Sequence, residues 1–161
     1  MRKIGFILLI LLSACQTDQS IKWANALENL KKAFNFSLQN GYCLVISFEG
    51  CSSCRSKAIA FLEKNLAYQE MRYILSAKQK RIIGFSVSEE ALANANVLID
   101  TNYHAHSLGL VSDFPVLYHI KNGMIKEVKT LSATNIDEEL HLLEIRLQKK
   151  LLMTLLSDYQ D

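Results

Sequence analysis

Two cysteines separated by two residues, Cys51 and Cys54, are the part of the sequence best suited to chemistry. The apolar run 44–46 leads into them, and the segment 55–66 has the apolar periodicity of a helix, so we expect the pair at a helix N-terminus. Free backbone N–H groups and the positive end of the helix dipole favour a thiolate there. We therefore expect Cys51 to attack disulfides and Cys54 to resolve the mixed disulfide that forms.

The spacing within the expected helix distinguishes the two thiols. Cys54, Ala58, Leu62 and Leu66 recur every four residues and so share the core-facing side, whereas Cys51 lies at the helix tip, outside that face. Thiol–disulfide exchange uses such a pair, with one sulfur accessible and the other shielded.

The N-terminus has the features of an export signal. Arg2 and Lys3 precede nine apolar residues, 4–12, a run too short for the ~20 residues that span a bilayer. The following residues, Leu12-Ser13-Ala14-Cys15, resemble the lipobox of bacterial lipoproteins. That resemblance implies cleavage before Cys15 and lipid attachment to it; an ordinary cleaved signal is the alternative. We expect a signal peptide at 1–14, a polar tether at 15–20 and one domain at 21–161.

Charge gives no indication of nucleic-acid binding. The chain has 18 basic and 16 acidic residues, and losing Arg2 and Lys3 with the signal makes the two numbers equal. We therefore expect no nucleic-acid partner. The remaining length is usual for one domain.

The fourth cysteine, Cys43, lies in the strand-like run that leads to the pair, directly before Leu44. We expect it to be a small buried apolar residue, in preference to a redox role, because nothing in the neighbouring sequence would stabilise a thiolate.

Strand and helix patterns alternate along the chain, which favours an α/β domain with a central sheet. The expected strands are 42–48, 71–76, 81–87 (the weakest), 97–100, 116–120 and 124–128. We expect a first helix that is capped by Ser20, ends at Asn40-Gly41 and has Trp23, Leu27, Leu30 and Phe34 on one face. Three further helices are expected at 55–66, at a short segment that begins at Ser88, and at 103–110. The last expected helix begins near Thr134 and has one apolar face, made up of Ile136, Leu140, Leu143, Leu147 and Leu151.

Pro115 is the only proline, and it directly precedes an expected strand. Because proline cannot donate to a sheet ladder, it marks a strand start, and Asn122-Gly123 then predicts the turn of a hairpin.

This order of elements resembles the thioredoxin superfamily, in particular bacterial thioredoxin-like lipoproteins. The resemblance rests on Cys51-Ser52-Ser53-Cys54 between a strand and a helix, and on Phe114-Pro115 before a hairpin and a closing helix. The resemblance implies a thioredoxin-like fold with a central mixed β-sheet flanked by helices. It implies a cis-proline at Pro115 beside the dithiol, and an extended substrate segment paired with the backbone of Phe114.

The same resemblance implies a thiol:disulfide oxidoreductase that needs no cofactor or metal. Its partners would be exported protein disulfides or another redox protein, and its place the bacterial cell envelope, lipid-anchored with the domain in the periplasm.

Three positions depart from the family pattern. Gly50 stands where thioredoxins often have tryptophan, which predicts a more open lip. The family's buried acid has no clear match, because Val45 or Ser47 occupies that region and Glu49 lies close to the loop. Ser52-Ser53 matches neither common reductants nor common oxidants, so the direction of electron flow stays open.

Several other interpretations fit the motif. The pair could be a structural disulfide, although so short a loop stabilises little. Cys51 and Cys54 could join one or both of His104 and His106 in a copper or zinc site for metal binding or delivery. The domain could also be a tethered binding module with a vestigial redox pair. Arg55 could hold a thiolate by charge, whereas Lys57 is expected on a solvated face.

Overall fold

The computed structural model describes residues 22, 25–26, 28–35 and 37–158. The expected signal peptide, the tether with Cys15, the capping Ser20, and Trp23 and Leu27 of the first helix lie outside the described residues.

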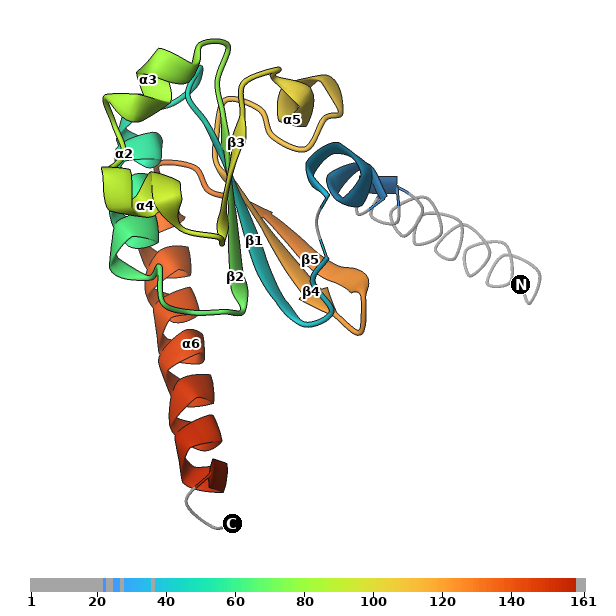
Figure 1. Cartoon of the computed structure of the whole chain (residues 1–161), viewed down its shortest axis with the longest axis vertical. Helices are drawn as coiled ribbons and strands as arrows, with labels where there is room; N and C mark the ends of the chain where they lie inside the picture. The colour runs from blue at the N-terminus through green and yellow to red at the C-terminus, as the bar shows by residue number, and fades with distance from the viewer. Residues whose placement is uncertain (1–21, 23–24, 27, 36, 159–161) are drawn as a thin grey trace, which may run out of the picture.

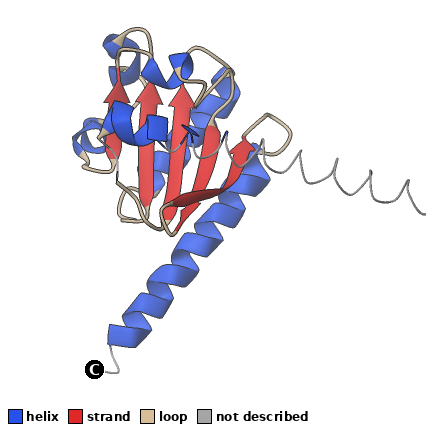
Figure 2. Cartoon of the chain, turned by 90° about the vertical axis from the view of Figure 1, so that its right-hand side faces the viewer, coloured by secondary structure: helices blue, strands red, loops and turns tan. Residues whose placement is uncertain are grey.

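Five strands form one mixed sheet in the order β3-β2-β1-β4-β5. The strands are β1 (Gly41–Ser47), β2 (Met71–Ser76), β3 (Val97–Asp100), β4 (Val116–Lys121) and β5 (Met124–Thr130). β1, β2 and β3 run parallel to one another, and β4 is antiparallel to both β1 and β5. The expected α/β class and the hairpin after Pro115 are confirmed (Figure 2).

Helices cover both faces of this sheet (Figures 1 and 2). One face packs against α2 (Ser52–Lys64), α4 (Glu89–Ala93) and the long α6 (Ile136–Asp158), and the other against the helical residues 28–34 and α5 (His104–Ser107). Side chains alternate along β1: Leu44 and Ile46 join the first core, and Cys43 and Val45 join the second. All four side chains are fully buried, because both faces of β1 are covered, and this explains why its sequence is a continuous apolar run.

The expected strand at 81–87 is wrong. The segment forms the short helix α3 (Lys80–Gly84) followed by a turn. Its buried side chains, Ile83 and Val87, are four residues apart, while Phe85 between them is 81% exposed. That spacing suits a helical turn and places no continuous face against the sheet.

Two helix boundaries also differ from expectation. The first helix ends at Phe34, well before Asn40-Gly41, because Asn35 adopts a left-handed conformation at φ 46°. α2 begins at Ser52 and not at residue 55, so Cys54 already lies in its first turn.

The last helix, α6, has 23 residues, and its second half extends past the end of the sheet (Figure 1). Ile136, Leu140, Leu143 and Leu147 are buried as expected, but Leu151 is 49% exposed. Across the described part of the chain, α6 included, no helix is both long and apolar enough to cross a membrane.

Candidate active site

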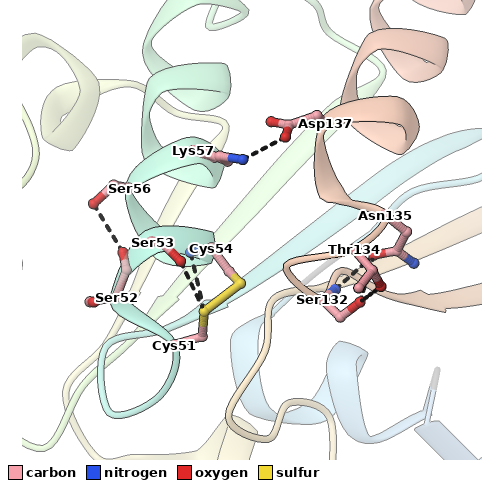
Figure 3. Close-up of a disulfide and its surroundings, with 10 residues drawn as sticks. All are labelled: Cys51, Ser52, Ser53, Cys54, Ser56, Lys57, Ser132, Thr134, Asn135 and Asp137. Carbon is pink, nitrogen blue, oxygen red and sulfur yellow. Dashed lines mark hydrogen bonds and ion pairs between the residues drawn. A yellow bond between two sulfur atoms is a disulfide. The ribbon is translucent and has the colours of Figure 1, made fainter.

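Cys51 and Cys54 form a disulfide just beyond the carboxyl end of β1, with their Cα atoms 5.4 Å apart (Figure 3). Cys51 is the N-cap residue of α2 and Cys54 lies one turn into that helix. The strand therefore delivers the first cysteine to the end of the helix where unpaired backbone N–H groups point outward.

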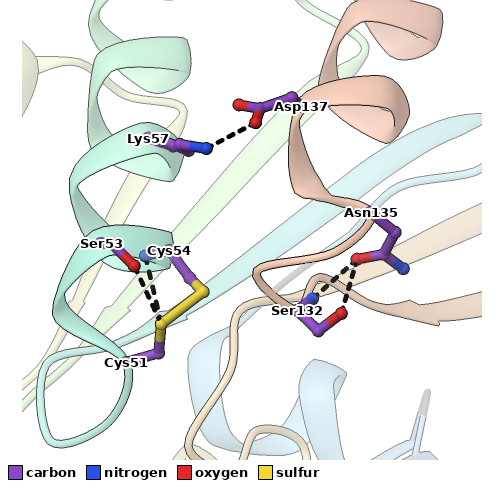
Figure 4. Close-up of polar contacts among 7 residues, drawn as sticks. All are labelled: Cys51, Ser53, Cys54, Lys57, Ser132, Asn135 and Asp137. Carbon is purple, nitrogen blue, oxygen red and sulfur yellow. Dashed lines mark hydrogen bonds and ion pairs between the residues drawn. A yellow bond between two sulfur atoms is a disulfide. The ribbon is translucent and has the colours of Figure 1, made fainter.

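The environments of the two sulfur atoms differ. Cys54 is 1% exposed and packs in the core with Ala58 and Leu62, whereas Cys51 is only partly buried. The Sγ of Cys51 accepts a hydrogen bond of 3.3 Å from the backbone N–H of Cys54 and lies 3.4 Å from the Oγ of Ser53 (Figure 4). In the reduced protein the same donors and the helix dipole would favour a thiolate at Cys51.

The proline loop lies against this site. The backbone N–H of Cys51 donates to the carbonyl oxygen of Asp113 at 2.7 Å, and Phe114 and Cys51 pack against the same core. Pro115 is buried and its carbonyl accepts from the N–H of Leu131 at 2.8 Å. The loop is therefore beside the dithiol, as the resemblance implied.

The peptide bond before Pro115 is trans, like every other peptide bond among the described residues. The implied cis-proline is thus wrong for this structure. Proximity to the cysteines here comes from the Cys51–Asp113 backbone bond and the burial of the proline ring.

Gly50 closes the lip of the site instead of opening it. A Cβ at this position would overlap the carbonyl oxygen and Cα of Asp113, so only glycine lets the two loops approach this closely. The expectation of a more open lip is wrong, since the backbone of the proline loop fills the space.

The described residues place no buried carboxylate at Cys54. Val45 packs in the core on the opposite face of the sheet, and Glu49 accepts from the backbone N–H of Lys78 at 3.3 Å. The one buried acid in the described part of the chain, Asp100, accepts from the backbone N–H groups of the first turn of α5. The family's buried acid therefore has no counterpart beside Cys54 among the described residues.

The two basic residues of the first turns of α2 are both engaged. Arg55 donates to the carbonyl oxygen of Phe48 at 2.7 Å and lies over its ring, which holds the loop leading to the dithiol. Lys57 pairs with Asp137 at the start of α6 (Figure 4). It is exposed as expected, but it links two helices at the surface instead of being merely solvated.

Cys43 is fully buried in the core on the other side of the sheet from Cys54. Burial raises the pKa of its thiol to about 12, opposed weakly by the charge of Arg72. The expected buried apolar role is confirmed.

The histidines of the alternative metal site are not gathered around the cysteines. The Nε2 of His106 forms a 3.0 Å hydrogen bond with the Oγ of buried Ser47, and its ring stacks on Tyr103 with the centroids 4.2 Å apart. His104 is exposed. No group of three or more His, Cys, Asp or Glu side chains in the described ranges could hold a metal ion.

Two neighbours of the site were not anticipated. Asp113 contributes through its backbone, so its side-chain type gave no signal. Tyr103 adopts a left-handed conformation at φ 58°. Desolvation raises the pKa of its hydroxyl, and the negative charges of nearby Glu49 and Asp113 raise that pKa further. The left-handed residue lies just before α5, a position that helical periodicity does not reveal.

The sheet order and the place of the disulfide now decide the architecture. Three parallel strands, an antiparallel hairpin, and a cysteine pair at the start of the helix that follows the central strand form one known arrangement. The fold is thioredoxin-like. No family model matches the chain, and no curated protein matches it.

Among solved structures, the chain is similar to a peroxiredoxin-like protein from Aquifex aeolicus. The identity is 13% and the TM-score 0.38, over 66% of this chain and 74% of that one. So distant a likeness carries no argument about activity; the thioredoxin-like topology and the close cysteine pair of this chain themselves fit a redox function.

Proposed function

We propose that the protein is a thiol–disulfide oxidoreductase in which Cys51 is the nucleophile and Cys54 the resolving thiol. The observation that carries this is the disulfide at the N-terminus of α2, with one cysteine partly accessible and the other buried. Exchange requires attack from outside on one sulfur only, and this burial allows it.

The reduced protein would begin with the thiolate of Cys51, which attacks one sulfur of a partner disulfide. The partner's S–S bond breaks, its other sulfur leaves as a thiolate and takes a proton from water, and a mixed disulfide remains. Cys54 then loses its proton to solvent and attacks the Sγ of Cys51. The second partner thiolate leaves, and two electrons have passed from the cysteine pair to the partner. The reverse sequence would oxidise a partner dithiol.

Substrate contact is proposed at the proline loop. Phe114 is half-buried and packs against the same core as Cys51, and the Cys51–Asp113 hydrogen bond holds the loop at the nucleophile. An extended partner segment at the backbone of Phe114 would place its own disulfide close to Cys51.

We further propose that the domain acts on exported proteins or another redox protein, tethered in the periplasm through a lipid on Cys15. The support is the sequence alone: a basic, apolar segment followed by Leu12-Ser13-Ala14-Cys15. Several acyl chains, at ~0.8 kcal/mol per buried CH₂, suffice to hold a protein on a membrane.

Dithiothreitol-driven reduction of insulin tests the activity. The wild-type protein should accelerate it, and Cys51→Ser should reduce the acceleration to background. Cys43→Ala is the matched control, because it removes a thiol on the opposite face of the sheet and should leave turnover unchanged. Turnover by Cys51→Ser equal to wild type would show the disulfide to be structural.

A further inference from the structure

A pocket of about 280 Å³ lies at the amino end of β1, between the sheet and α6. β1 and β4 are paired here with Tyr42 opposite His119, and the two rings stack with their centroids 4.7 Å apart. Lys121 comes two residues after His119 on β4 and therefore lies on the same face of the sheet. Arg146 and Lys150, about one turn apart on α6, complete the lining of what we name the basic pocket.

The basic pocket has an excess of positive charge. Lys121, Arg146 and Lys150 are exposed cations, and Glu70 is the one carboxylate among the residues that line the pocket. Glu70 pairs with Lys150, whose Nζ lies 3.1 Å from a carboxylate oxygen. Neither Lys121 nor Arg146 forms an ion pair with another described residue. Two positive charges therefore remain at this pocket without a compensating acid.

Two further carboxylates come close to Arg146 but are already bound. Glu127 of β5 and Glu139 of α6 line an adjoining pocket together with Arg146. Both pair with Lys129, at 3.4 Å and 2.6 Å respectively. These carboxylates are thus paired with a different cation, which leaves the guanidinium of Arg146 available to a ligand.

The ring of His119 is affected by both uncompensated cations. Burial lowers the pKa of His119 from its ordinary value of 6.5; Glu127 opposes this, and the charges of Arg146 and Lys121 lower the pKa further. The two cations therefore act at the same ring, although one belongs to α6 and the other to β4. The imidazole is neutral at pH 7, and an anion bound beside it would raise its pKa.

We propose that the basic pocket binds a phosphate group. The planar guanidinium of Arg146 can donate to two phosphate oxygens at once, and Lys121 supplies a second positive charge from the strand. A phosphate monoester carries a charge of about −1.5 to −2 at pH 7, which matches the two uncompensated cations, whereas a carboxylate would neutralise only one of them. The headgroup of an anionic phospholipid presents the same phosphate oxygens, so a soluble phosphate and a lipid are two sources of one ligand chemistry.

Titration with inorganic phosphate, followed by NMR on the isotopically labelled full chain, tests the site. Sodium chloride is adjusted to hold the ionic strength constant, so that screening does not change. We expect saturable shifts in the signals of Tyr42 and His119. The pKa of His119 should also rise, because bound phosphate offsets the charges of Arg146 and Lys121. Shifts that sodium chloride alone reproduces would count against the site.

Two substitutions on α6 separate a specific site from a generally basic surface. Arg146→Gln removes a positive charge that lines the pocket and should weaken binding by about 10-fold. Lys149→Gln removes a positive charge from a neighbouring exposed position outside the pocket and should bind like wild type. Equal binding by Arg146→Gln and wild type, to whichever probe the wild-type protein binds, would overturn the proposal.

Lipid vesicles distinguish the two sources of the phosphate group. The full chain is sedimented with vesicles of phosphatidylcholine alone, or of phosphatidylcholine and phosphatidylglycerol in equal parts. A soluble ligand predicts a saturable phosphate titration and no preference between the vesicles. A lipid headgroup predicts a preference for phosphatidylglycerol that is lost when Lys121→Gln and Arg146→Gln are combined. A preference that survives both substitutions without a saturable phosphate titration, or binding of neither probe, would overturn the proposal.

The basic pocket is independent of the proposed activity. It lies at the amino end of β1, and the seven residues of this strand separate its two ends by about 20 Å. Arg146→Gln and Lys121→Gln should therefore reduce insulin at the wild-type rate. Loss of phosphate binding with activity retained, and loss of activity with phosphate binding retained, are separate results.

Discussion

The backbone N–H of Cys51 donates a 2.7 Å hydrogen bond to the carbonyl oxygen of Asp113. This bond joins the N-terminus of α2 to the loop that begins β4, although the two residues are far apart in the sequence. It fixes the nucleophile of the proposed reaction to the segment proposed to bind substrate.

Gly50→Ala tests the importance of that contact. The new Cβ overlaps the carbonyl oxygen of Asp113, so one of the two loops must move and the Cys51–Asp113 bond should weaken. We expect a loss of about 1–3 kcal/mol in the free energy of unfolding, measured by urea denaturation, and slower insulin reduction.

Gly84→Ala is the control for that substitution. Nothing lies within 4 Å of a Cβ built at Gly84, which is in helix α3. Alanine there should be neutral or stabilise by about 0.5–1 kcal/mol, with activity unchanged. Equal behaviour of the two variants would mean that the close approach at Gly50 has no consequence.

Ser53→Ala should slow the attack by Cys51. The Oγ of Ser53 lies 3.4 Å from the Sγ of Cys51 and can donate to a thiolate there. Removing it should lower both the thiolate absorbance at 240 nm of the reduced protein at neutral pH and its rate of alkylation by iodoacetamide, by about threefold to tenfold. Ser52→Ala, one residue earlier and exposed, should match wild type in both measurements.

Small charged disulfides should reveal the carboxylates near the nucleophile. Asp113 is exposed beside Cys51 and Glu49 is two residues before it, so cationic cystamine should react faster than anionic oxidised glutathione. At low ionic strength we expect the ratio of their rate constants to fall about threefold in Asp113→Asn. In the wild-type protein this ratio should also fall in 0.5 M salt, because at that ionic strength salt screens charges that are more than roughly 4 Å apart. An unchanged ratio in both experiments would exclude an electrostatic effect of Asp113.

Cys43 should make stability depend on alkaline pH. Its folded pKa of about 12 is above the ordinary value of 9.0, because burial disfavours the thiolate. Below pH 9 the thiol is protonated in both states, so it causes no pH dependence. Above pH 9 only the unfolded chain releases the proton, and stability should fall by about 1 kcal/mol per pH unit.

Cys43→Ala should remove that part of the alkaline slope in urea denaturation between pH 9 and 10. An identical slope in the two proteins would contradict the assignment. In the folded reduced protein at pH 8, Cys51 should react with a thiol reagent and Cys43 should not.

Local patterns predicted β1, β2, β4 and β5, because each is an uninterrupted apolar or alternating run between turn signals. They also predicted that Cys54 is buried and Cys51 is accessible, because the four-residue spacing of Cys54, Ala58 and Leu62 places Cys54 on the core-facing side of the helix. They failed at 81–87, where Ile83 and Val87 pack as a helical turn. The trans bond at Pro115, the closed lip at Gly50 and the left-handed Tyr103 depend on contacts between distant segments, which periodicity does not encode.

Capture of the mixed disulfide tests the division of roles most directly. The reduced Cys54→Ser protein, incubated with a disulfide-bonded peptide, should accumulate a stable adduct, and peptide mapping should place the peptide on Cys51. The reduced Cys51→Ser protein should form none. Equal adducts on Cys51 and Cys54 in the two variants, or no adduct in either, would contradict the account of an accessible nucleophile backed by a buried resolving thiol.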